Sequence, residues 1–140
     1  MRVSANRVVF GAALLWAGLC FTGLAAQEHG GNPVAAKLKS PVPANAASIA
    51  EGQKSYAKYC RHCHGDTGKG DGPQAPKGSM PSDFTDATWD HGSTDGEIFM
   101  VISEGAGKTS PMKGYKSKLT EKEIWQLVNY VRSLSKGAAD

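Results

Sequence analysis

A chain of 140 residues with 40% hydrophobic and 21% charged side chains has the length and composition of one ordinary globular domain. The 16 Lys and Arg residues against 13 Asp and Glu give a formal net charge of +3, which falls to about +1 without Arg2 and Arg7 near the N-terminus. This balance excludes the dense basic face that nucleic-acid binding requires.

Residues 1–26 have the pattern of a secretory signal peptide. Arg2 and Arg7 make the start basic, and an uncharged apolar run over residues 8–26 ends in small side chains. We therefore expect cleavage at the end of this run and export of the remainder to the periplasm. The alternative is an uncleaved membrane anchor, because 19 apolar residues come close to the roughly 20 that cross a bilayer.

The segment after the signal peptide, residues 27–47, is rich in Pro, Ala and Gly and has no apolar periodicity. Such a composition is typical of a flexible linker. We expect a single folded domain over residues 48–136, followed by a short C-terminal tail at residues 137–140.

The domain begins with a predicted helix. Ser48 is a suitable N-cap, and Ile49, Gly52, Tyr56 and Tyr59 follow at spacings of three and four that define one buried face. The helix leads directly to Cys60. The glycine in its middle offers a notch where the last helix could approach closely.

The chain then becomes irregular before two further helices. Four glycines in GDTGKGDGP, residues 65–73, together with Pro73, Pro76 and Pro81 exclude regular structure. Thr94 and Glu97 form a capping box for a short helix that ends by Gly105, and Thr120 and Glu123 form another for the last helix. The apolar stripe of that last helix consists of Ile124, Leu127, Val128, Val131 and Leu134. Since no alternating strand pattern occurs, the predicted fold class is all-α.

The stretch CRHCH, residues 60–64, concentrates metal-binding side chains. A zinc site would need a second pair of ligands, and a thioredoxin-like redox pair would need a βαβ pattern; the sequence offers neither. CxxCH in an exported chain is instead the attachment signature of c-type haem. Cys60 and Cys63, three apart on a helical turn, face the same way and can form two thioethers, and His64 can then reach the iron.

The sixth iron ligand has three candidates in the sequence. Met100 lies inside an apolar helix, where methionine usually fills core space. Met112 lies in a loop that Pro111 stiffens and that leads into the last helix, so it can cross the face opposite His64. Met80 is the alternative, and the absence of any methionine ligand is a third possibility.

These features resemble the class I cytochrome c family over most of residues 48–136. The matching pieces are the first helix ending in CRHCH, the GDGP loop, PSDFTDATW, TDGEIFMVI, a PM loop and EIWQLVNYVRSL. The resemblance implies a cytochrome c-like fold in which the N- and C-terminal helices pack against each other around one covalently attached haem. It is greatest to small bacterial single-haem cytochromes, some of which are haem domains of respiratory complexes.

The resemblance also implies roles for individual residues. Cys60 and Cys63 would be the thioether anchors, His64 the proximal ligand and Met112 the distal ligand. Many relatives place proline directly after the ligand methionine, whereas lysine follows Met112 here. Because Met80 does precede a proline, it remains the alternative ligand.

The expected axial ligation of the haem iron predicts what the protein does. With both axial positions filled, the iron has no open site for a substrate, so we expect a carrier of single electrons between redox proteins and no enzyme activity. One alternative is a haem c subunit of a larger respiratory or periplasmic oxidoreductase. Another is an open-site haem that binds a ligand or acts as a sensor.

The sequence also suggests where partners dock. Four lysines without an intervening acidic residue surround the proposed distal ligand: Lys108, Lys113, Lys116 and Lys118. We expect them to attract redox partners with acidic docking surfaces. The protein is expected to be a monomer that meets a membrane only if its N-terminal segment is uncleaved.

Overall fold

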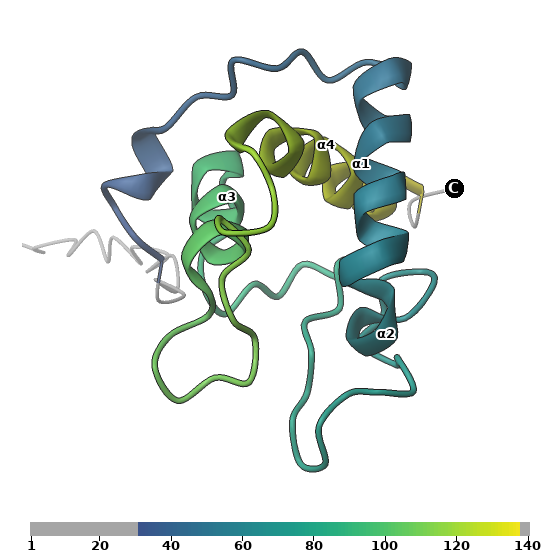
Figure 1. The fold of residues 1–140 in the computed structure, drawn as a ribbon. Coiled ribbons are helices and arrows are strands. Elements are labelled where there is room, and N and C mark those ends of the chain that lie inside the picture. The colour runs from purple at the N-terminus through teal and green to yellow at the C-terminus, as the bar shows by residue number, and fades with distance from the viewer. Residues whose placement is uncertain (1–30, 138–140) are drawn as a thin grey trace, which may run out of the picture.

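The computed structural model describes residues 31–137, which form a helical domain (Figure 1). Its elements in chain order are η1 (Ala35–Lys37), α1 (Ala46–Tyr59), α2 (Arg61–His64), α3 (Asp95–Glu104) and α4 (Glu121–Gly137). Within these residues no strand forms, and Gly105 and Lys113 pair in an isolated bridge. The all-α prediction is confirmed.

The predictions for the two ends of the chain fall largely outside this range. The predicted signal peptide, residues 1–26, and most of the predicted tail lie outside the described residues. Among the helices of residues 31–137, none has the length and apolar character needed to span a membrane.

The first helix begins earlier than predicted. Its N-cap is Asn45, whose side chain accepts a hydrogen bond from the Ser48 backbone N–H at 2.9 Å, while the Ser48 hydroxyl accepts one from the Asn45 N–H at 3.1 Å. The prediction of Ser48 as the cap is therefore wrong: Ser48 is the third helical residue of a capping box. Its hydroxyl also accepts from the Asn129 side chain at 3.1 Å, which ties the start of α1 to α4.

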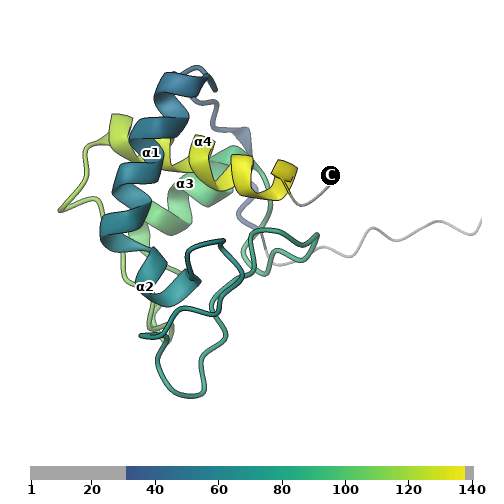
Figure 2. The ribbon, with the colours of Figure 1, turned by 90° about the vertical axis from the view of Figure 1, so that its right-hand side faces the viewer.

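α1 and α4 cross (Figures 1 and 2), and the two helices are in contact at Gly52. A Cβ atom at this position would overlap the carbonyl oxygen of Gln126 and would lie 2.8 Å from Cβ of Tyr130. Tyr56, one turn further along α1, packs against Tyr130 with ring centroids 5.0 Å apart. The predicted close approach of the last helix to Gly52 is confirmed.

The core of the domain is the inner face of α4. Four residues of its predicted apolar stripe are almost fully buried: Ile124, Leu127, Val128 and Val131. Each such side chain stabilises the fold by about 1.5–3 kcal/mol relative to an exposed position. Ile98 and Ile102 of α3 pack into the same cluster, so α3, α1 and α4 enclose one core.

The capping predictions for the later helices are confirmed. The Thr94 hydroxyl accepts from the Glu97 N–H, and the Glu97 carboxylate accepts from the Thr94 N–H at 2.9 Å and from its hydroxyl at 2.8 Å. Thr120 and Glu123 make the same reciprocal contacts at the start of α4. These caps fix where α3 and α4 begin.

The predicted linker, residues 27–47, differs from the structure in its described part. η1 lies beside α3, and the chain that follows passes over the top of the helices in the view of Figure 1 to reach the start of α1. Ala35 is buried, and its carbonyl lies so close to Gly96 of α3 that a Cβ there would overlap it. The Asn129 side chain donates to the carbonyls of Val42 and Pro43 at 3.4 and 3.2 Å. Small residues in this segment permit close backbone contact as well as flexibility, and here they lie against the domain.

Candidate functional site

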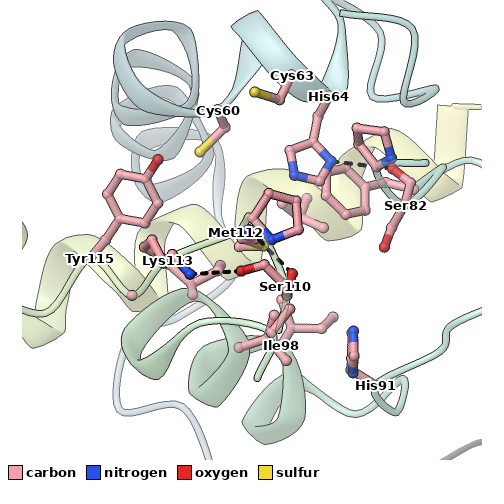
Figure 3. Close-up of a pocket in the computed structure, with 18 of the residues that line it drawn as sticks. Cys60, Cys63, His64, Ser82, His91, Ile98, Ser110, Met112, Lys113 and Tyr115 are labelled. Carbon is pink, nitrogen blue, oxygen red and sulfur yellow. Dashed lines mark hydrogen bonds between the residues drawn. The ribbon is translucent and has the colours of Figure 1, made fainter. Parts of the chain in front are cut away.

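A cavity of about 540 Å³ lies between the end of α1, α2 and the loops before and after α3 (Figure 3). Its inner wall is apolar, with Ile98 and Ile102 from α3 and Leu127 and Val131 from α4. Pockets of about 300–1,000 Å³ with apolar walls and a few polar groups are typical of cofactor sites. The cavity brings Cys60, Cys63, His64 and Met112 together.

The two cysteines lie at one side of the cavity. α1 ends at Tyr59, Cys60 turns the chain, and α2 carries Cys63. The Cys63 and His64 N–H groups both donate to the Cys60 carbonyl, at 3.1 and 3.0 Å, which makes the compact turn that brings both thiols to the same side. Both thiols are free, and burial, with a smaller contribution from Cys63, raises the pKa of Cys60 to about 12.

His64 projects from α2 into the cavity (Figure 3). Its Nδ1 lies 3.2 Å from the carbonyl oxygen of Ser82. A carbonyl can only accept a hydrogen bond, so Nδ1 carries the proton and Nε2 keeps its lone pair for a metal. Burial lowers the pKa of His64, with the Ser82 hydrogen bond acting in the opposite sense, so the imidazole is held in its neutral, ligating form.

Met112 lies across the cavity from His64 (Figure 3). Its loop is held to the end of α3 because the Ala106 N–H donates to the Met112 carbonyl at 3.2 Å and the Tyr115 N–H to the Ile102 carbonyl at 2.9 Å. Met112 is half-buried and packs against the hydrophobic core. Met80, by contrast, is 96% exposed at the rim of the cavity.

The four lysines of the predicted docking patch are in different situations. Lys113 and Lys118 line the cavity. The Lys116 ammonium pairs with the Glu104 carboxylate at 2.6 Å, and Lys108 is exposed in the loop after α3. The structure therefore brings two of the four to the cavity.

The donor set fits a covalently attached haem. Two thiols lie on one side, an imidazole and a thioether come from different segments of the cavity lining, and the inner wall is apolar. Within residues 31–137 no group of three or more His, Cys, Asp or Glu side chains has the arrangement of a bare-metal site. His62, between the two cysteines, does not line the cavity.

Sequence reasoning missed two residues that contact His64. The Ser82 carbonyl had no sequence signal, because every residue supplies a carbonyl. The ring of Phe84 stacks on the imidazole with centroids 4.6 Å apart. An aromatic residue two positions after Ser82 was visible in PSDFTDATW, but only the folded loop brings it to the histidine.

The fold and the site define a class I cytochrome c domain. The family described as cytochrome c oxidase, cbb3-type, subunit III matches residues 47–131, which is more than half of the chain. The protein belongs to this cytochrome c family, and haem c, attached through a CxxCH motif, is its cofactor.

Curated relatives include subunits of cbb3-type oxidases. The chain is 33% identical over 89 residues to subunit FixP of Bradyrhizobium diazoefficiens, covering 63% of this chain and 28% of that protein. It is 32% identical over 100 residues to subunit CcoP of Rhodobacter capsulatus, covering 68% of this chain and 32% of that protein. The chain thus spans about a third or less of the length of these relatives.

Solved structures confirm the fold. A chain of the reducing HAO-like protein complex of Kuenenia stuttgartiensis superimposes with a TM-score of 0.62 at 30% identity, over 71% of this chain and 48% of that one. Cytochrome cL of Methylophaga aminisulfidivorans superimposes with a TM-score of 0.52 at 23% identity, over 64% and 54%. The predicted cytochrome c-like fold is confirmed.

Proposed function

We propose that this protein is an exported single-haem cytochrome that carries one electron at a time between redox proteins. The observation that carries the proposal is the opposition of His64 and Met112 across a cavity that Cys60 and Cys63 flank. When bound, haem c supplies the one-electron iron couple. The work of the chain is to attach, orient and enclose that group.

In this proposal the cysteines anchor and the histidine ligates. Cys60 and Cys63 form the two thioethers, and His64 offers Nε2 because its Nδ1–H is directed at the Ser82 carbonyl. Such a carbonyl partner fixes the tautomer and the orientation of a ligating imidazole.

Met112 closes the opposite axial position. A neutral thioether favours ferrous iron, so the reduction potential is higher than with two histidines. With both positions filled, no site is open to a substrate, which is why we propose electron transfer and no catalysis. Met80 is the weaker alternative for the axial ligand because it is exposed: its side chain would have to leave solvent and cross the rim of the cavity.

A basic face beside the cavity serves for docking. Two of the predicted lysines, Lys113 and Lys118, line the cavity, and a neighbouring groove contains Lys54, Lys58 and Lys122. Tyr59 and Lys118 line both hollows, so the groove is continuous with the cysteine side of the cavity. The two hollows together contain five lysines against three acidic residues, Glu51, Asp90 and Glu123, and this excess of positive charge favours an acidic partner surface even though Lys54 pairs with Glu51.

A second candidate function is a haem c subunit of a larger oxidoreductase. The names of the relatives favour it, because FixP and CcoP are subunits of cbb3-type oxidases and the Kuenenia chain comes from a complex. Purification from the native host under mild conditions separates the two: a carrier elutes at the size of one chain, and a subunit elutes with fixed partners.

Axial ligation tests the proposal itself. The oxidised protein should show a sulfur-to-iron charge-transfer band, and the reduced protein should bind carbon monoxide slowly. Rapid carbon monoxide binding by the native reduced protein would instead support an open-site haem that binds a ligand or acts as a sensor.

A further inference from the structure

A continuous series of stacked side chains leads from His64 to the protein surface. The imidazole lies against the ring of Phe84, with centroids 4.6 Å apart and planes inclined by 22°. Phe84 in turn stacks on Trp89, at 5.8 Å and 28°. The guanidinium of Arg132, on α4, lies 5.6 Å from the centre of the Trp89 ring. These separations are in the range of favourable aromatic and cation–π contacts.

The outer end of the series is anchored. Arg132 Nε donates to the Asp95 carboxylate at 2.7 Å, and its terminal nitrogen also bonds the Ser93 carbonyl. Asp95 is the first residue of α3, so this ion pair joins α3 to α4. The cation is thereby held over the outer ring.

Phe84 is anchored as well. Its N–H donates to the Gly68 carbonyl at 2.7 Å. Gly68 has φ +79°, and a Cβ there would lie 3.2 Å from Cδ2 of the Phe84 ring. The ring is therefore enclosed by the glycine-rich loop on one side and by Trp89 on another.

One short segment thus holds the imidazole in two ways. The Ser82 carbonyl fixes the position of Nδ1, which leaves the ring free to twist about the line of that hydrogen bond. The flat face of Phe84, two residues later, resists that twist. Together the two contacts define both where the ring points and how its plane is turned.

We propose that Phe84 is a positioning residue that sets the orientation of the His64 imidazole plane, with Trp89 and Arg132 holding Phe84 in place. The proposal rests on the function proposed above, in which His64 is the proximal iron ligand. The plane of an axial imidazole splits the iron d orbitals, so the g values of the ferric protein report its orientation. Neighbours that orient a ligand tune the metal without touching it.

The test compares four variants of the haem-loaded protein, at Phe84, Trp89 and Phe99, by electron paramagnetic resonance and redox titration. Phe84→Leu removes the flat face and keeps apolar bulk, whereas Phe84→Tyr keeps the face. Phe99→Leu is the matched control: Phe99 stacks on Trp125 at 4.3 Å and 20° but does not line the cavity.

We expect Phe84→Leu to shift and broaden the low-spin g values and to move the reduction potential, while Phe84→Tyr and Phe99→Leu keep the wild-type values. Trp89→Leu should produce a smaller change of the same kind. This variant replaces Phe84→Leu in the test if Phe84→Leu does not retain haem. The inference is overturned if Phe84→Leu, or in its place Trp89→Leu, has wild-type g values, or if Phe99→Leu changes them equally. A wild-type protein without histidine–methionine ligation would overturn the proposed function as well, and this result is visible before any variant is made.

Discussion

Gly52 of α1 lies directly against the backbone carbonyl of Gln126 in α4, with no room for a Cβ atom between the two helices. This contact sets the distance between the helices on which the cavity depends, because α1 ends directly before the first cysteine and α4 contributes Leu127 and Val131 to the inner wall.

Gly52→Ala should therefore destabilise the haem-loaded protein. The added methyl overlaps backbone, which cannot move as a flexible side chain can, and overpacking of this kind costs about 1–3 kcal/mol. Chemical unfolding measures the loss. Gln53→Ala, at an exposed position on the same helix, is the control and should leave the midpoint nearly unchanged; equal effects of the two substitutions would contradict this account.

Met112→Ala should abolish the sulfur-to-iron charge-transfer band and let the reduced protein bind carbon monoxide rapidly, since the substitution removes the thioether opposite His64. Met80→Ala is the control. Because Met80 is 96% exposed, its removal should leave the spectrum unchanged. The opposite pattern would assign the axial position to Met80.

We expect Glu97 to make the free energy of unfolding depend on pH. Burial raises its pKa, but the hydrogen bonds it accepts from Thr94 and from the backbone N–H groups of Asn32 and Ser93 outweigh burial, and the net pKa is lowered. A carboxyl whose folded pKa lies below its unfolded value stabilises the fold fully above the unfolded pKa, and this contribution is lost as pH falls through the folded pKa.

The measurement is the denaturant midpoint of wild type and Glu97→Gln at neutral pH and below the ordinary value of 4.5. The wild type should be the more stable at neutral pH, and the difference should shrink in acid. Glu121→Gln, an exposed carboxylate in the first turn of α4, is the control. A difference between Glu97→Gln and wild type that does not change with pH would refute the carboxylate's role.

The basic face can be tested without a known partner by using ferricyanide, a small anionic oxidant. Charge reversal at Lys58 and Lys118 should slow oxidation of the reduced protein by about tenfold at low salt and flatten its dependence on ionic strength. Lys39→Glu, exposed and outside both hollows, should have little effect. If all three substitutions slow the oxidation equally, the net charge of the protein sets the rate, and the proposed basic face is contradicted.

The features that the sequence predicted well are local. The capping boxes at Thr94 and Thr120 and the stripe of α4 follow from spacing alone, because the residues that cooperate are three or four apart. Gly52 was recognisable because a glycine on the buried face of a helix has few other uses. CxxCH was informative for the same reason, since its ligands are adjacent.

What the sequence did not predict depends on distant contacts. Serine suits the N-cap position, so the sequence indicates Ser48. Asn45 suits it equally, and it is the cap because it lies where the preceding chain turns onto α4. The segment from residue 32 to 45 lies against α3 and α4 in part through the carbonyl groups of Ala35, Val42 and Pro43, and carbonyl contacts leave no side-chain pattern in the sequence. The contact between Phe84 and His64 likewise exists only once the glycine loop has folded back.

The measurement that tests the central claim most directly is the intact mass of the purified protein together with its alkaline pyridine spectrum. The account predicts one haem per chain, retained under denaturing conditions, with the spectrum of a haem bound through two thioethers; Cys60→Ser and Cys63→Ser should each alter that spectrum. An unmodified polypeptide mass, or a haem that dissociates on denaturation, would contradict the covalent haem c centre.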